Sequence, residues 1–231
     1  MSATQAIVIA LGLSLVVQVG YAQDRSSYRG FRLGSDLSSI ATAAKIAASG
    51  AKTIHQRPAL IQELDWRPVY MMTGSAAAQN DPVQRIVFAF YNDQLFKLVV
   101  SYDRWKTNGL TDGDMIEAIS TTYGPALLQS SPHNLNIVDS EIDRELGPPI
   151  ALWGDADYAV GLYRSSFASE FRVVVSSPRL AALAGIAAAE AARLDEREAP
   201  QREADRKNKE AEDARASQEK ARLANKATFK P

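Results

Sequence analysis

Hydrophobic and polar residues alternate in two similar stretches of the chain. The first, IVFAFYNDQLFKLVVSY, runs from Ile86 to Tyr102, and the second, YAVGLYRSSFASEFRVVVSS, runs from Tyr158 to Ser177. Because successive side chains of a strand point to opposite faces, this alternation predicts two strands and a turn in each stretch. Each stretch is therefore predicted to be an antiparallel hairpin with an apolar face.

Matching the apolar residues fixes the expected register of the first hairpin. A two-residue loop would place the apolar residues of its two strands on opposite faces of the sheet. A three-residue loop, Asn92–Gln94, pairs Phe90 with Phe96. The same loop pairs Phe88 with Leu98 and would contain a left-handed residue.

In the second hairpin the predicted loop is longer and spans Ser165–Glu170. With this loop, Val160 lies opposite Val175. Leu162 then lies opposite Val173, so the apolar residues of both strands share one face.

Each hairpin is preceded by a segment with apolar residues at helical spacing. The first begins at the candidate N-cap Ser35 and is expected to end at Gly50. The second begins at Thr111, with Asp114 in the position of a capping-box acid, and ends at Gly124. The apolar stripes are Leu37, Ile40, Ala41 and Ala44 in the first helix, and Met115, Ile116, Ile119 and Tyr123 in the second.

Two further segments resemble strands, ALIQELDWRPVYMM in the first half and PIALWG in the second. The pattern of Phe96–Ser101 recurs in Phe171–Ser176. The two cap residues, Ser35 and Thr111, are separated by nearly the same number of residues as these two patterns. We therefore expect an α+β fold in which residues 23–177 form a tandem repeat, with halves at about 31–104 and 105–177. Each half has one helix and about three antiparallel strands.

Residues 178–231 differ from the rest of the chain because they are rich in alanine and in charges of both signs. Ser177 and Pro178 suit the N-cap and first position of a helix. Leu180, Leu183 and Ala187 are expected to contact the sheet. Pro200 is expected to interrupt this long, charged C-terminal helix, and the solvated part beyond it is expected to be frayed or partly disordered.

Residues 1–22 resemble a secretory signal peptide. An apolar run from Ala6 to Val17 precedes small residues at Gly20 and Ala22, although no basic residue comes before Arg25. Cleavage after Ala22 would give a bacterial periplasmic or secreted protein that begins at Gln23. The alternatives are an uncleaved membrane anchor and a buried N-terminal helix.

Composition narrows the classes of function. The net charge is −1, which argues against binding to nucleic acid. The chain has no cysteine, so disulfides, thiolate metal sites and a cysteine nucleophile are excluded. The sequence predicts no cofactor and assigns no oligomeric state.

Candidate catalytic and metal-binding residues are weakly supported. His55 and His133 lie in segments typical of loops, and neither has a metal-binding partner at helical spacing. The motifs beginning at Asp112 and Asp155 are better explained as a helix start and a turn. Four acids, Glu63, Asp65, Glu141 and Asp143, have no spacing that requires catalysis. We predict no catalytic residue and no metal site.

Two clusters of aromatic and basic residues are the candidate binding sites. They are Trp66, Arg67 and Tyr70 in the first, and Tyr102, Arg104 and Trp105 in the second. Trp, Tyr and Arg are enriched at interaction hot spots. The alternative is that Trp66 and Trp105 cap the core between helix and sheet.

The stretches FRLGSDLSSI and GLTDGDMIEAISTTYG resemble the starts of the helix-and-meander units in the small outer-membrane assembly lipoproteins of the BamE/SmpA type and in the β-lactamase inhibitor proteins. The resemblance covers at most Gly34 to Ser177. It implies protein binding rather than catalysis. The lipobox cysteine of the lipoproteins is missing, which excludes lipid anchoring, and so are the cysteines of the inhibitors.

The sequence therefore favours an exported, non-catalytic envelope protein that binds another protein or an envelope component. One alternative is a secreted hydrolase that uses scattered carboxylates and His133. The other is a protein tethered to the membrane by an uncleaved N-terminal segment.

Overall fold

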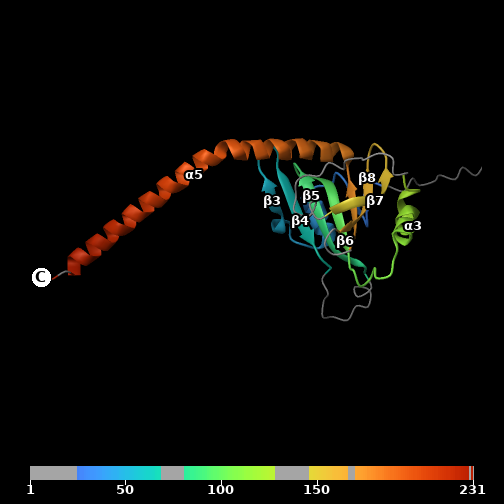
Figure 1. Ribbon diagram of the computed structural model, residues 1–231, viewed down its shortest axis with the longest axis horizontal. Coiled ribbons are helices and arrows are strands. Elements are labelled where there is room, and N and C mark those ends of the chain that lie inside the picture. Colours follow the sequence, from blue (N-terminus) through green and yellow to red (C-terminus); the bar gives the residue numbers. More distant parts are fainter. Residues whose placement is uncertain (1–24, 69–80, 128–145, 166–169, 229, 231) are drawn as a thin grey trace, which may run out of the picture.

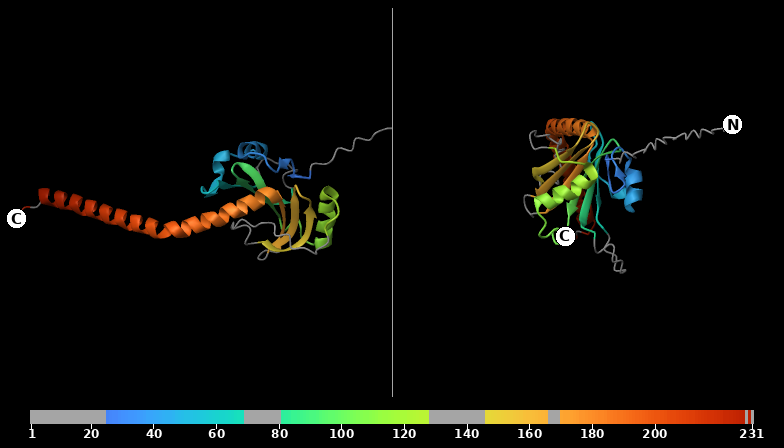
Figure 2. Two further views of the ribbon diagram at one scale, coloured as in Figure 1. Left: turned by 90° about the horizontal axis from the view of Figure 1, so that it is seen from above. Right: turned by 90° about the vertical axis from the view of Figure 1, so that its right-hand side faces the viewer.

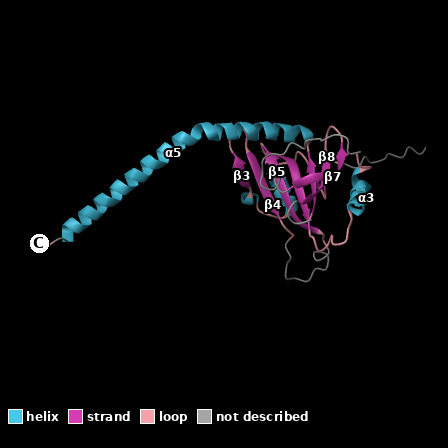
Figure 3. Ribbon diagram, in the orientation of Figure 1, coloured by secondary structure: helices cyan, strands magenta, loops and turns pink. Residues whose placement is uncertain are grey.

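The computed structural model describes residues 25–68, 81–127, 146–165, 170–228 and 230. The fold is α+β, as expected, and is built on a seven-stranded antiparallel sheet with strand order β3-β4-β5-β6-β9-β8-β7 (Figures 1 and 3). The strands are β3 (Lys52–His55), β4 (Ile61–Trp66), β5 (Val83–Tyr91), β6 (Gln94–Tyr102), β7 (Leu146–Gly154), β8 (Ala159–Ser165) and β9 (Phe171–Ser176).

The helices lie on both faces of this sheet (Figure 2). α1 (Leu37–Ala44) and α3 (Asp112–Tyr123) share the main core with one set of strand residues. A short ribbon of β1 (Ser27–Tyr28) and β2 (Phe31–Arg32) joins that core, and a 3-10 turn, η1 (Ala48–Gly50), follows α1. The long helix α5 (Pro178–Thr228) packs against the opposite face.

The predicted helix stripes are buried apart from Ile116, which is half-buried, but the first helix is shorter than expected. Asp36, not Ser35, is the N-cap of α1, because its Oδ1 accepts a hydrogen bond from the Ser39 amide at 2.8 Å. The helix ends at Lys45, which is left-handed with φ of 56°, whereas Gly50 belongs to η1. The predicted position of the C-terminal end is therefore wrong.

The start and end of α3 are as predicted. Thr111 and Asp114 form a capping box, in which the Thr111 amide donates to Asp114 Oδ2 at 2.7 Å. The Asp114 amide in turn donates to the Thr111 hydroxyl at 3.2 Å. Gly124 follows the helix with φ of 86°, a backbone conformation that favours glycine.

The first hairpin forms only one of its two predicted pairs, and it does so with a different turn. Its turn has only two residues, Asn92 and Asp93, both left-handed, so the predicted three-residue loop is wrong. A bulge opposite Phe90 corrects the register, and Phe88 does pair with Leu98. The bulge places Phe96 on the face covered by α5, in place of the predicted pairing with Phe90.

The second hairpin has the predicted register. Val160 pairs with Val175, and Leu162 pairs with Val173. The Ser165 amide donates to the Glu170 carbonyl at 2.8 Å, which closes the loop. All four apolar residues lie in the main core.

β6 and β9, the two strands with matching sequence patterns, pair with each other at the centre of the sheet. Val99 lies opposite Val174, the residue that matches it in the sequence pattern. On either side of this pair, Lys97 lies opposite Ser176, and Ser101 lies opposite Arg172. The pairing is thus symmetric about Val99 and Val174, with a basic residue and a serine exchanged between the strands.

α5 begins at Pro178, as predicted, and continues through Pro200, so the predicted interruption is wrong. Its first part buries Leu180 and Ala187, but Leu183 is 40% exposed. Residues 199–228, which we call the arm, are exposed throughout. The axis changes direction beyond the sheet (Figure 1), and a proline inside a helix is an ordinary cause of a kink. Fraying of the arm stays a prediction.

Candidate functional site

The connector between β6 and α3, residues 103–110, forms one wall of a cleft. Asp103 organises this connector, because its Oδ1 accepts a hydrogen bond from the Trp105 amide at 2.7 Å. Its backbone carbonyl accepts from the amide and the hydroxyl of Thr107, both at 3.0 Å. Thr107 is buried. The connector is therefore a fixed turn whose hydrogen bonds hold Arg104 and Trp105 outward.

Arg104 and Trp105 form a stacked pair on the outside of this turn. The Arg104 guanidinium carbon lies 4.4 Å from the centre of the Trp105 ring, well within the range of a cation–π contact. Trp105 is 72% exposed, the most exposed of the large hydrophobic side chains among the described residues. The alternative interpretation, that Trp105 caps the core, is therefore wrong.

The opposite wall comes from β8 and β9. Arg164 lies over the ring of Phe171, with its guanidinium carbon 4.3 Å from the ring centre. The same guanidinium forms an ion pair with Asp112 in the first turn of α3. Because Phe171 is a core residue, its ring gives this wall a fixed base.

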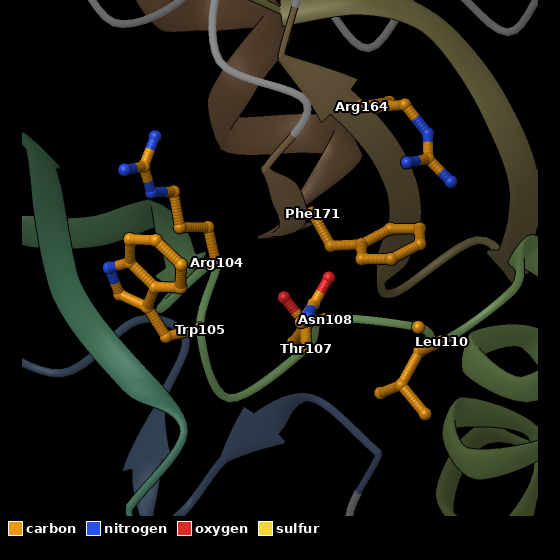
Figure 4. A pocket seen from close by; sticks show the side chains of 8 residues that line it. Arg104, Trp105, Thr107, Asn108, Leu110, Arg164 and Phe171 are labelled. Atoms are coloured by element: carbon orange, nitrogen blue, oxygen red, sulfur yellow. The ribbon is translucent and has the colours of Figure 1, made fainter.

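The cleft between these walls has a volume of about 460 Å³, within the usual range for ligand pockets. We call it the connector cleft. Figure 4 shows the Arg104–Trp105 stack on one side and Arg164 with Phe171 on the other. Its lining residues are Arg104, Trp105, Thr107, Asn108, Gly109, Leu110, Arg164 and Phe171.

The connector cleft has two positively charged side chains, and they differ in how available they are to a ligand. Among the described residues, two arginines and no acid line the cleft. Arg164 is already paired with Asp112. Arg104 forms no ion pair with a carboxylate of the described residues, and its guanidinium contacts the Trp105 ring. The edge of the Arg104 guanidinium is therefore the cationic group most available to an anionic ligand.

Of the first aromatic cluster, Trp66 and Arg67 do not line this cleft. The Trp66 indole donates a hydrogen bond to the Ala44 carbonyl at 3.1 Å, which fixes the end of α1 to the sheet. The alternative interpretation, a core cap, is correct for Trp66. Arg67 follows β4 and is exposed, and its Nε lies 3.8 Å from Asp65 Oδ1. Tyr70 lies outside the described residues.

Tyr102 also has a structural position. Its hydroxyl is 3.2 Å from that of Tyr28, and its ring packs against the main core. Burial raises the pKa of both tyrosines. Burial likewise raises the pKa of Tyr123 to about 12. Tyr123 donates a hydrogen bond to the Ser27 carbonyl at 2.9 Å, so these tyrosines join the N-terminal ribbon to the core.

The other candidate chemistry has little support in the described residues. Asp155 Oδ1 accepts hydrogen bonds from the amides of Asp157 and Tyr158, as expected of a turn residue. Asp65 accepts hydrogen bonds from Arg85 Nε at 2.9 and 3.0 Å. His133, Glu141 and Asp143 lie outside the described residues. Within the described ranges, no three His, Asp or Glu residues are grouped so that they could hold a metal ion.

Among the described helices, none combines the length and the apolar character needed to cross a membrane.

Sequence reasoning identified Arg104 and Trp105 but missed Arg164 and Phe171. These two residues belong to the second hairpin, far from the connector in sequence. They reach the cleft because β9 pairs with β6, which brings the start of β9 beside the end of β6. A signal for this arrangement was present in the matching patterns of the two strands, but their side-by-side pairing was not deduced from it.

Comparisons of the chain with protein-family models, with curated proteins and with solved structures gave no match. The resemblance to the envelope lipoproteins and inhibitor proteins therefore stays a prediction.

Proposed function

We propose that this chain is an exported, non-catalytic protein of the bacterial envelope that binds another protein or an envelope component through the connector cleft. The observation that carries the proposal is the Arg104–Trp105 stack. A tryptophan that is 72% exposed on a hydrogen-bonded turn removes little apolar area from water in the free chain. Contact with a partner would bury that area, and Trp and Arg are the residue types that dominate such contacts.

The rigidity of the connector supports a binding role. Interactions gain affinity when the contact residues are held in place before binding, because less conformational entropy is lost on association. The hydrogen bonds that Asp103 accepts hold the backbone beside Trp105, and the Arg104 contact restricts the Trp105 ring. Trp66 and Trp153, in contrast, use their indole nitrogens in internal hydrogen bonds.

The experiment is site-specific photo-cross-linking in cells that produce the full chain. A photoreactive amino acid replaces Trp105, and a matched control replaces Ile186, which is similarly exposed at 69% on α5. The proposal predicts a discrete adduct at position 105 that is absent at position 186. Equal adducts at both positions, or none at position 105, would contradict it.

Export is a separate part of the proposal and has a separate measurement. The apolar run and small residues before Gln23 are typical of a cleaved signal. The intact mass of the exported protein is expected to correspond to a chain beginning at Gln23. A mass that retains residues 1–22 would favour the tethered alternative.

We also propose that the two halves arose by duplication. The support is the symmetric pairing of β6 with β9 about Val99 and Val174. In this arrangement each half would cover a sheet edge that the other half leaves open, since unpaired edges promote aggregation.

A further inference from the structure

The charge and shape of the connector cleft indicate what kind of partner it accepts, if the proposed binding function is correct. We propose that the cleft binds an acidic segment of a partner protein. In this segment a carboxylate contacts the guanidinium of Arg104, and a neighbouring apolar side chain packs against Trp105.

The first argument is electrostatic. The described part of the cleft lining contains two arginines and no acid, and Arg104 forms no ion pair with a described carboxylate. A guanidinium presents two parallel N–H donors that match a carboxylate, and such charge-assisted pairs are stronger than neutral hydrogen bonds. Stacking on Trp105 holds the guanidinium plane in place, so an incoming carboxylate meets a fixed donor pair.

Exposed apolar side chains also line the cleft beside its basic groups. Trp105 is 72% exposed and Leu110 is 42% exposed, and both line the cleft together with the two arginines. A peptide in which acidic and apolar side chains are neighbours complements this arrangement. In a ligand of this kind, the apolar groups remove water from around the ion pair and thereby strengthen it.

The same geometry disfavours an anionic membrane surface. Lipid headgroups are recognised by clusters of about 4–8 basic residues. The connector offers Arg104 and Lys106, with Asp103 beside them, and the opposite wall adds only Arg164, which is paired with Asp112. A single arginine stacked on an aromatic ring is better suited to one carboxylate at a defined position.

The test uses the full chain and the peptide acetyl-Phe-Asp-Glu-Phe-amide, with acetyl-Phe-Asn-Gln-Phe-amide as the uncharged control. Binding is measured by calorimetry and by Trp fluorescence. We expect the acidic peptide to bind with a dissociation constant below about 1 mM and the amide peptide at least about tenfold more weakly.

Variants locate the binding site. Arg104→Gln is expected to weaken acidic-peptide binding about 10- to 100-fold, because it removes the charged donor pair. Arg104→Lys keeps the charge but not the planar pair, and is expected to lie between this variant and the wild type. Arg215→Gln changes the net charge equally on the exposed arm and should have no effect.

The outcomes separate this inference from the proposed function. No acidic-peptide binding at about 1 mM, or equal losses in the Arg104 and Arg215 variants, overturns it. So does binding of phosphatidylglycerol vesicles, but not of the peptide, that depends on Arg104. If cross-linking at position 105 succeeds while the peptide fails, the binding function stands and the acidic partner is wrong.

Discussion

Phe96→Ala tests the bulge that distinguishes the structure from the pairing expected from sequence. Phe96 is completely buried between the sheet and α5. Its cluster contains only two other buried large side chains, Ile61 and Leu180, and the remaining members of its buried set are alanines. The Phe96 carbonyl also accepts a hydrogen bond at 2.8 Å from the amide of Ser177, the residue immediately before α5.

Two effects set the expected cost of the substitution. Removing a buried aromatic ring loses about 1.5–3 kcal/mol of burial free energy. The ring leaves a cavity of roughly 80 Å³, which adds about 2 kcal/mol at about 24 cal/mol per Å³ if the site does not collapse. The alanines of α5 have side chains too short to fill the cavity that the ring leaves. We therefore expect a loss of about 3–5 kcal/mol, whereas Phe96→Leu should retain most of the stability.

The assay is urea denaturation combined with hydrogen exchange. The structure predicts that exchange in Phe96→Ala rises in residues 178–191 of α5 more than in α1. If Phe96 paired with Phe90 on the α1 face, the order would be reversed. A free energy of unfolding within about 0.5 kcal/mol of the wild type would refute the packing argument.

Three further predictions concern the cap, the tyrosines and the arm. Thr111→Ala should lower the free energy of unfolding by about 0.5–2 kcal/mol in urea denaturation, and Thr111→Ser should not. The pKa of Tyr123, about 12 when folded, exceeds its value of about 10 when unfolded. The folded state therefore binds more protons between these values, and its stability should fall as pH rises from about 10 to 12. Tyr123→Phe should show a smaller fall, and equal falls would contradict this reasoning. Amides of residues 201–228 should exchange far faster than those of residues 178–191, because no core residue holds the arm; equal protection would show a contact that the arm lacks here.

The sequence was most informative where local chemistry determines the structure. The Thr111 capping box, the Gly124 terminus and the buried stripe of α1 follow from side chains close in sequence. The first helix was predicted too long because Lys45 adopts the left-handed conformation, usually left to glycine, and ends the helix early. Strand β3 was not predicted, because its four residues carry no clear alternation.

Non-local pairing was harder to predict. Apolar matching correctly paired Phe88 with Leu98, but it could not distinguish a longer loop from a two-residue turn followed by a bulge. In these two solutions Phe96 lies on opposite faces of the sheet. The two-residue turn with a bulge is favourable because α5 covers Phe96 on the face where the bulge places it. In the same way, Arg104 and Trp105 could be identified from residue type, whereas Arg164 and Phe171 required the β6–β9 pairing.

The proposed function requires the protein to contact its partner at the connector cleft. The most direct test is the NMR spectrum of the full chain with ¹⁵N-labelled tryptophan, recorded with and without the purified partner obtained by cross-linking. Trp66 and Trp153 have internally hydrogen-bonded indoles, while Trp105 is exposed. If the partner binds at the connector cleft, the indole signal of Trp105 shifts or broadens, and the indole signals of Trp66 and Trp153 do not change. An unchanged Trp105 signal with a saturating partner would contradict it.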